Sequence, residues 1–225
     1  MNGIKPKLLI FINTLQTGGA ERVVSLLLDH LKDDFEIHLA LYSNYVDYTI
    51  PPEIKVFNLH QPLIQNKVTR FLKLPGISRK VYRYCKKNNI NTSVAFLYRP
   101  CYINAIMKSF LGYRGRVIMC EGTHQTTMQE SHSAIYRMFS KFMVMYSYKR
   151  AHLILANSYA IRTDLIENFR IKTPVRVIYN PVDLQLIKSN AAEEPDLVFE
   201  KDVFHFITVG NLRKEKNQLL LIQAF

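Results

Sequence analysis

The feature that most constrains the fold is a regular alternation of short apolar runs with amphipathic segments. Residues 7–13 (KLLIFIN) form a continuous apolar run, which is typical of a strand buried in a parallel sheet. A polar turn with two glycines follows at residues 14–19, and residues 20–34 then place apolar side chains on one helical face. This order of strand, glycine turn and helix indicates the start of a βαβ unit.

The same alternation continues along the chain. Further strands are predicted at residues 35–42, 54–59, 92–98, 116–121, 152–157 and 175–179. Helices are predicted at residues 102–110, 133–148 and 159–169, and at residues 67–88 with an interruption at Pro75 and Gly76. The pattern predicts an α/β fold with a doubly wound, Rossmann-like parallel sheet that is covered by helices on both faces.

The composition changes near residue 188. Residues 188–202 are acidic and polar, so we predict a first domain at residues 1–187 and a linker at residues 188–202. Residues 203–210 predict a new strand and residues 214–225 a new helix. A lone strand and helix cannot bury their own apolar faces. We therefore expect residues 203–225 to begin a second domain or to pack against the first one.

Charge is distributed unevenly along the chain, whose net charge is +12. Residues 54–120 and 131–163 contain many Lys and Arg residues but no Asp or Glu. Such stretches attract anionic lipid headgroups, nucleic acid or phosphate-bearing substrates, although a solvated basic surface would have the same composition. The aromatic and basic segment at residues 137–150 suits either a membrane surface or core packing.

The sequence also bears on the cellular compartment. Its first residues lack the long apolar stretch and the cleavage site of a secretory signal, and no apolar run is long enough to span a bilayer. Cys85, Cys101 and Cys120 are too few and too widely spaced for a disulfide framework. Together with the basic stretches, these features predict a cytoplasmic protein that is peripheral on the inner face of the plasma membrane.

The pair Gly18 and Gly19 lies where the first strand meets its helix. Backbone N–H groups and the helix dipole favour an anion at such a position, and glycine lets a phosphate or a sugar approach the backbone closely. The pair matches neither the GxGxxG pattern nor a P-loop, so a plain tight turn is the alternative interpretation.

Polar residues follow several predicted strands, at the sheet edge where parallel α/β proteins bind ligands. Glu121 is a candidate general base or a helix-capping acid, and His124 is either catalytic or structural. Their occurrence at one edge is better evidence for a site than any single residue. The other polar residues predicted at this edge are Arg99, Asn157, Ser158 and Asn180.

A third cluster consists of Arg213, Lys214 and Lys216, after the strand predicted at residues 203–210. Bases at a helix start oppose the helix dipole, which favours an anionic ligand such as a diphosphate there. A solvated helix N-terminus is the alternative. No group of His and Cys residues has the spacing of a metal site.

Together these motifs resemble the family-4 type of retaining GT-B glycosyltransferases over nearly the whole chain. Their order and spacing are more specific than any one of them. The resemblance implies two Rossmann-like domains that face a cleft, the first binding the acceptor and the second binding the nucleotide-sugar. The motifs are TGGAERVV, FLYRPCYIN, EGTH, ANSYAIRTDLI, VIYNPVDL and VGNLRKEKNQLLLIQAF.

The resemblance also implies roles for individual residues. The Gly18-Gly19 pair would lie beside the donor phosphates and sugar, and His124 would contact the transferred sugar. Lys216 would bind the donor diphosphate, and Arg213 is the candidate to replace an arginine that the family usually has at the position of Asn211. Basic side chains and dipoles would stabilise the departing diphosphate without an obligatory metal. From their positions after predicted strands, and not from the resemblance, the residues expected to bind the acceptor or line the cleft are Arg99, Glu121 and Asn180.

We therefore predict a glycosyltransferase that moves a sugar from a nucleotide-sugar to a lipid-linked or cell-surface glycan with retention, and that needs no cofactor. The paired glutamates of the family's donor domain would lie beyond residue 225, so we expect a truncated chain that is inactive alone. The alternative is a standalone acceptor-side module that works with a separate donor-domain chain. Nucleic acid is not an expected partner, because the sequence lacks a recognition motif for it.

Overall fold

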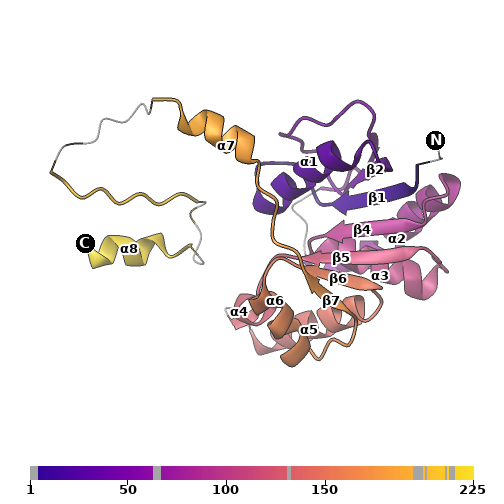
Figure 1. Ribbon diagram of the computed structural model, residues 1–225. Coiled ribbons are helices and arrows are strands. Elements are labelled where there is room, and N and C mark those ends of the chain that lie inside the picture. The colour runs from indigo at the N-terminus through magenta and orange to yellow at the C-terminus, as the bar shows by residue number, and fades with distance from the viewer. Residues whose placement is uncertain are drawn as a thin grey trace. The chain divides into compact units, whose positions relative to one another are not determined.

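Parallel strands in the order β3-β2-β1-β4-β5-β6-β7 form one sheet in the computed structural model, which describes residues 5–62, 67–130, 133–194, 200, 202–210, 212 and 216–225 (Figure 1). The order reverses between β1 and β4, which is the switch point of a doubly wound, Rossmann-like α/β fold. The predicted fold class is confirmed. The strands are β1 (Lys7–Ile12), β2 (Glu36–Leu41), β3 (Lys55–Asn58), β4 (Thr92–Phe96), β5 (Arg116–Glu121), β6 (Leu153–Ala156) and β7 (Val175–Val177).

Helices lie on both faces of the sheet. One face carries α1 (Gly19–Leu31). A short helix that the sequence did not predict, α4 (Gln125–Glu130), leads from β5 to α5. The opposite face carries α2 (Lys67–Lys87), α3 (Tyr98–Phe110), α5 (Ala134–Tyr148) and α6 (Tyr159–Glu167).

Each face of the sheet has its own apolar cluster, because successive side chains of β1 point to opposite faces. Leu8 and Ile10 join a cluster with Val24 of α1. Leu9 and Phe11 join the larger cluster formed with α2, α3, α5 and α6. Burial on both faces explains why the first strand reads as an unbroken apolar run.

The interruption predicted at Pro75 and Gly76 is wrong, because α2 continues through both residues. Leu74 and Ile77 are buried on either side of Pro75, and Ser78 Oγ donates to the Leu74 carbonyl at 2.8 Å. Proline inside a helix costs about 3 kcal/mol. Packing of α2 on the sheet outweighs that local cost.

The chain divides into two compact units, Met1–Val182 and Asp183–Phe225. The second unit contains α7 (Leu184–Ala191) and α8 (Gln218–Ala224). The domain end predicted at residue 187 therefore falls inside α7. The assignment of residues 203–225 to a donor-binding domain stays a prediction.

The strand predicted at residues 203–210 is absent, since these residues are described and adopt no strand conformation. A strand is stable only when it is paired within a sheet, and the described part of the second unit contains no strand to pair with it. Phe204 and Val209 are accordingly 92% and 90% exposed.

Among the described residues, no helix combines the length and the apolar composition that crossing a membrane requires.

Candidate active site

The carboxyl ends of β1, β4 and β5 lie next to one another in the sheet, so the segments that follow them meet at one edge. The Gly18-Gly19 pair follows β1. Arg99 lies in the first turn of α3, because this helix begins at Tyr98 and not at residue 102 as predicted. Glu121 is the last residue of β5, and His124 follows it.

Glu121 is buried and accepts three hydrogen bonds from neighbouring residues. The Thr123 backbone N–H donates at 2.9 Å, Gln125 Nε2 donates at 2.5 Å, and the Tyr148 hydroxyl also donates. Burial raises the pKa of Glu121 to about 7, although hydrogen bonds, that of Tyr148 foremost, act in the opposite direction. This carboxyl group therefore exchanges a proton near neutral pH.

Gln125 bridges the segments that follow β4 and β5. Its Nε2 group donates to Tyr98 Oη at 3.0 Å as well as to Glu121. Tyr98 follows Leu97, which has φ +69° and ψ 166°. A residue with a side chain rarely adopts this conformation, which costs about 1–3 kcal/mol and persists only where surrounding contacts enforce it. The bridge thus links the helix that follows this strained turn to the segment that follows β5.

His124 is 40% exposed and is positioned by its neighbours on α4 and α6. Its Nδ1 atom lies 3.0 Å from Thr127 Oγ1 and 3.4 Å from the Thr127 backbone nitrogen. Asp164 Oδ2 is 3.7 Å from the same Nδ1 atom, which is too long for a hydrogen bond. Because the Thr127 N–H can only donate, this contact favours the tautomer in which Nδ1 accepts and Nε2 carries the proton. His124 can thus donate a hydrogen bond from Nε2 to a ligand.

Asp164 of α6 is buried and fixes the turn that carries His124. It accepts hydrogen bonds from the Thr126 backbone N–H at 3.1 Å, from the Thr126 hydroxyl, and from Asn168 Nδ2 at 2.8 Å. Burial acts to raise the pKa of Asp164, but the hydrogen bonds from Thr126 and Asn168 outweigh it and hold the pKa below its ordinary value. The carboxylate is therefore ionised at neutral pH.

The glycine pair leaves open space at the N-terminus of α1. Apart from its chain neighbours and the backbone of its own helix, a Cβ atom on Gly19 would have no heavy atom within 4 Å, whereas a Cβ atom on Gly18 would collide with the carboxyl group of Glu21. Gly18 has φ −175°, an ordinary extended conformation, and no side chain caps the helix. The open space lies beside backbone N–H groups that suit an anion. Asp47 steadies the preceding turn by accepting from the Thr17 N–H at 2.9 Å.

The remaining predicted residues lie further apart. The Arg99 guanidinium carbon is 5.0 Å from the centre of the Tyr42 ring, at the end of β2. Asn180 is exposed and follows β7, which is two strands away from β5. Lys216 lies in the second unit, where its Cδ is 3.6 Å from the place of a Cβ atom on Gly210. Arg213 and Asn211 lie outside the described residues.

Sequence reasoning did not identify the residues that position Glu121 and His124. Gln125 and Thr127 lie within the predicted cluster, so their proximity in the chain was a usable signal. Tyr148 and Asp164 are distant from their partners in the chain, by 27 residues from Glu121 and by 38 residues from Thr126. No sequence spacing indicates contacts of this kind.

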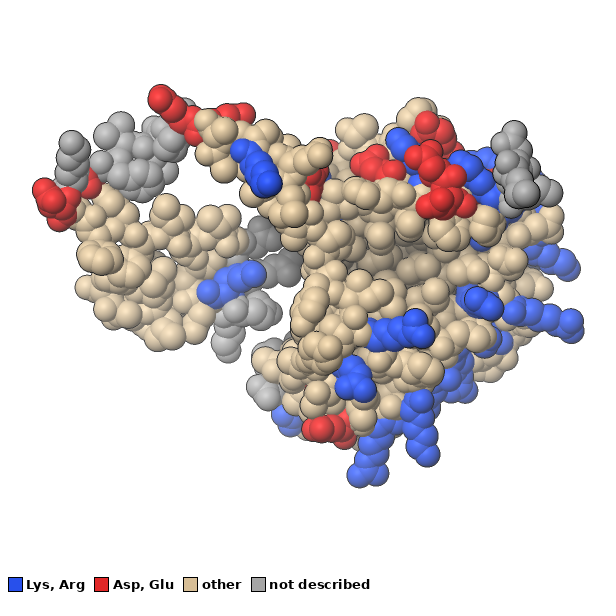
Figure 2. All heavy atoms as spheres, viewed as in Figure 1, with Lys and Arg blue, Asp and Glu red and all other residues tan. Residues whose placement is uncertain are grey.

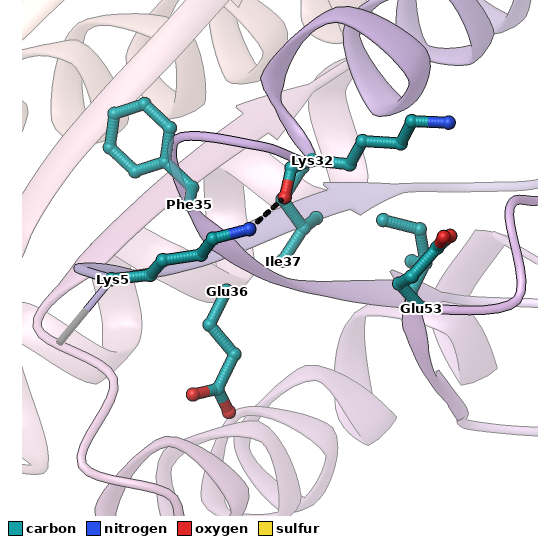
Figure 3. Close-up of a pocket in the computed structure, with 7 residues that line it drawn as sticks. Lys5, Lys32, Phe35, Glu36, Ile37 and Glu53 are labelled. Atoms are coloured by element: carbon teal, nitrogen blue, oxygen red, sulfur yellow. Dashed lines mark hydrogen bonds between the residues drawn. The ribbon is translucent and has the colours of Figure 1, made fainter. Parts of the chain in front are cut away.

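A cavity of about 290 Å³ lies at the opposite, amino edge of the sheet and is shown in Figure 3. Lys5, Lys32 and Glu53 line it, and Lys5 Nζ donates to the Lys32 carbonyl at 2.9 Å. Ligands of this fold bind at the carboxyl edge, so the cavity is not part of the candidate site. Within the described ranges, no group of three or more His, Cys, Asp or Glu side chains could hold a metal ion.

The fold and the site define a Rossmann-like domain with glycine and polar residues at the carboxyl edge of its switch point. The model of one family, Glycosyltransferase Family 4, matches residues 17–186. The chain therefore belongs to Glycosyltransferase Family 4.

Known proteins show the same relationship. The chain is 38% identical over 221 residues to N-acetylgalactosamine-N,N'-diacetylbacillosaminyl-diphospho-undecaprenol 4-alpha-N-acetylgalactosaminyltransferase of Campylobacter jejuni subsp. jejuni serotype O:2 (strain ATCC 700819 / NCTC 11168). The match covers 97% of this chain and 59% of that enzyme.

Two solved structures share the fold at low identity. Sucrose-phosphate synthase from Thermosynechococcus elongatus matches with a TM-score of 0.67 and 12% identity, over 81% of this chain and 50% of that one. Anabaena HepE in complex with UDP and glucose matches with a TM-score of 0.56 and 18% identity, over 80% of this chain and 46% of that one. The chain thus spans about half the length of these structures.

Proposed function

We propose that this chain forms the acceptor-binding side of a glycosyltransferase that moves a sugar from a nucleotide-sugar to a lipid-linked or cell-surface glycan. The observation that carries the proposal is the 38% identity, over 97% of the chain, to an enzyme named as an N-acetylgalactosaminyltransferase of a diphospho-undecaprenol substrate. The aligned length leaves at most a few residues of this chain unmatched, so the relationship extends over the candidate active site.

The candidate site offers the groups that this reaction needs. His124 presents Nε2–H for a hydrogen bond to a sugar oxygen, since Thr127 occupies Nδ1. The open N-terminus of α1 beside Gly19 suits the negative charge of the donor phosphates. In the proposed mechanism Lys216 and Arg213 stabilise the departing nucleoside diphosphate, so that no metal is required. The anomeric configuration is retained, as the family resemblance implies.

We also propose that the protein works at the inner face of the plasma membrane. The acid-free, basic stretches at residues 54–120 and 131–163 favour an anionic surface. The acceptor named for the Campylobacter relative carries an undecaprenol lipid, which resides in a membrane. Both observations support a peripheral enzyme that collects its acceptor from the bilayer.

Calorimetric titration with UDP-sugars and GDP-sugars tests the proposal. The chain is titrated alone and joined to the part of the Campylobacter relative that the match does not cover. Donor binding by the joined protein only is the expected result. Binding by the chain alone would contradict the assignment of this half to the acceptor, and binding by neither protein would contradict the proposed function.

A further inference from the structure

The first half of α5 carries an apolar stripe that faces away from the sheet. Ile135, Met138 and Phe142 are 78%, 71% and 61% exposed, and Phe139 is 42% exposed. Their spacing puts them on one side of the helix, whereas Val144, further along α5, is buried on the other side. Exposed apolar patches of this kind mark sites of membrane or protein interaction.

A basic stripe on α2 also faces away from the sheet. The core face of α2 is marked by the buried residues Leu74, Ile77 and Val81. Arg79, Arg83 and Lys86 lie on the opposite side of the helix and are exposed, and Leu72 in the same row is 76% exposed. The whole of α2 contains no Asp or Glu.

Both helices pack on α3, and one ring contact joins them directly. The Phe71 ring of α2 meets the Phe139 ring of α5 edge to face, with 5.0 Å between their centres. We call the two stripes together the α2–α5 outer face, which consists of Leu72, Arg79, Arg83 and Lys86 of α2 and Ile135, Met138, Phe139 and Phe142 of α5.

Acidic and basic side chains of the first unit lie over different elements, and the helices of the α2–α5 outer face belong to the basic part. Figure 2 shows Asp and Glu side chains gathered over the region of α1 and β2, while Lys and Arg predominate over the region of α2, α3 and α5. The helices α2, α3 and α5 contain no acidic residue at all. An anionic surface therefore meets no like charge from these helices.

A row of aromatic rings connects this surface to the candidate active site. Tyr98, which bonds to Gln125 at the site, lies 6.5 Å from Tyr102 between ring centres. Tyr102 is in turn 6.4 Å from Phe71, which contacts Phe139 of the outer face. The rings therefore form continuous packing between the outer face and the carboxyl edge of the sheet.

We propose that the α2–α5 outer face docks on an anionic lipid bilayer, with the stripe of α5 inserted among the acyl chains and the bases of α2 against the phosphates. The inference rests on the proposed function, since a lipid-linked acceptor brings the site to a membrane. A protein partner would bury the stripe equally well. The basic row and the lack of acidic residues in α2, α3 and α5 favour the bilayer.

Co-sedimentation of the purified chain with lipid vesicles tests whether the α2–α5 outer face binds a bilayer. The vesicles are pure phosphatidylcholine or an equimolar mixture with phosphatidylglycerol. Phe142→Ser should weaken binding to the anionic vesicles on the order of tenfold, because it removes an inserted apolar group. Arg83→Glu should weaken it by a similar factor and should make binding less sensitive to salt.

Matched controls are available on the opposite face of the sheet. Val56 is 47% exposed on β3, and its neighbour Phe57 stacks on Tyr84 of α2, so Val56 points to the other face. Arg176 of β7 is exposed, and its neighbour Val175 joins the cluster on the α2 side. Val56→Ser and Arg176→Glu should therefore bind vesicles like the unchanged chain.

A second measurement does not depend on loss of binding. The chain contains no Trp, so Phe142→Trp gives a single fluorescent reporter and Val56→Trp its control. Brominated lipids should quench the indole fluorescence of the Phe142→Trp variant and leave that of the Val56→Trp variant unquenched. Equal quenching of both reporters, or of neither, would overturn the proposal.

The remaining outcomes separate the alternatives. If Arg83→Glu abolishes vesicle binding but Phe142→Ser does not, the contact with the bilayer is only electrostatic. The proposed insertion of the α5 stripe would then be wrong. Self-association that Phe142→Ser abolishes, without vesicle binding, would identify a protein interface instead. Vesicle binding is measured without a nucleotide-sugar, so its failure leaves the titrations that test the proposed function unaffected.

Discussion

His124 Nδ1 lies within hydrogen-bonding distance of Thr127 Oγ1, at 3.0 Å, on the short helix that follows β5. Together with the Thr127 backbone N–H, this contact favours the tautomer in which Nδ1 accepts and Nε2 carries the proton. The orientation of the exposed ring is thus set from within α4. The proposed role of His124 in contacting the transferred sugar depends on this arrangement.

Thr127→Val should weaken the preference for this tautomer, because the hydroxyl contact to Nδ1 at 3.0 Å is lost and only the longer contact of the backbone N–H, at 3.4 Å, remains. We expect a larger fraction of the Nδ1–H form, measured from the imidazole nitrogen chemical shifts by NMR. Thr127→Ser retains a hydroxyl and should keep the original tautomer. Identical nitrogen shifts in Thr127→Val and the unchanged chain would show that Thr127 does not position the ring.

Asp164→Ala should destabilise the first unit by about 1–3 kcal/mol, because it leaves the Thr126 N–H and hydroxyl without their acceptor. The free energy of unfolding in urea measures this loss. A carboxylate whose folded pKa is lowered stabilises the protein above its unfolded pKa, near 3.8, and loses that contribution as the pH falls through the folded pKa. Asp164→Asn should therefore show a weaker acid destabilisation below pH 4 than the unchanged chain, and an identical profile would contradict the account.

Glu121 should make the protein less stable as the pH rises from about 4.5 to about 7. Its folded pKa is raised, so the folded state binds a proton that the unfolded state has already released in this window. Glu121→Gln, which cannot ionise, should flatten this part of the stability profile by an amount on the order of 1–3 kcal/mol. Glu53→Gln is the control, since Glu53 is exposed at the amino edge of the sheet. If the pH profiles of stability for Glu121→Gln and Glu53→Gln were parallel, the folded pKa of Glu121 would not be raised, which would contradict the account.

Gly19→Ala separates a ligand role of the glycine from a structural one. Beyond its chain neighbours and the backbone of its own helix, the added Cβ meets no atom within 4 Å, so the melting temperature should be unchanged or slightly higher. If the donor phosphates approach this backbone, the KM for the nucleotide-sugar should rise on the order of tenfold in the joined protein. Gly18→Ala should instead displace the Glu21 side chain. An unchanged KM in Gly19→Ala would indicate a plain tight turn.

The sheet could be predicted from the sequence because its signals are local. The unbroken apolar run of β1 and its glycine turn follow from burial on both faces of one strand, and they identified the edge where Glu121 and His124 lie. The contact of Glu121 with Tyr148 depends instead on packing between β5 and α5. Such a contact has no periodic signature in the sequence.

The errors also have physical reasons. The proline of α2 was interpreted from its local cost alone, whereas the buried residues on both sides of it decide the outcome. The run VFHFITVG has the composition of a strand but is paired with none among the described residues, so its apolar side chains are largely exposed. Local pattern predicts an element only where the tertiary structure supplies its partner.

An assay of sugar transfer tests the proposed glycosyltransferase function most directly. The chain is joined to the part of the Campylobacter relative beyond the match, incubated with nucleotide-sugars and an undecaprenyl diphosphate-linked glycan, and analysed by mass spectrometry. The account predicts a product heavier by one sugar residue, and a kcat lower by roughly 10- to 1,000-fold in His124→Ala. A folded, donor-binding protein that transfers no sugar, or one in which His124→Ala turns over at the unchanged rate, would contradict it.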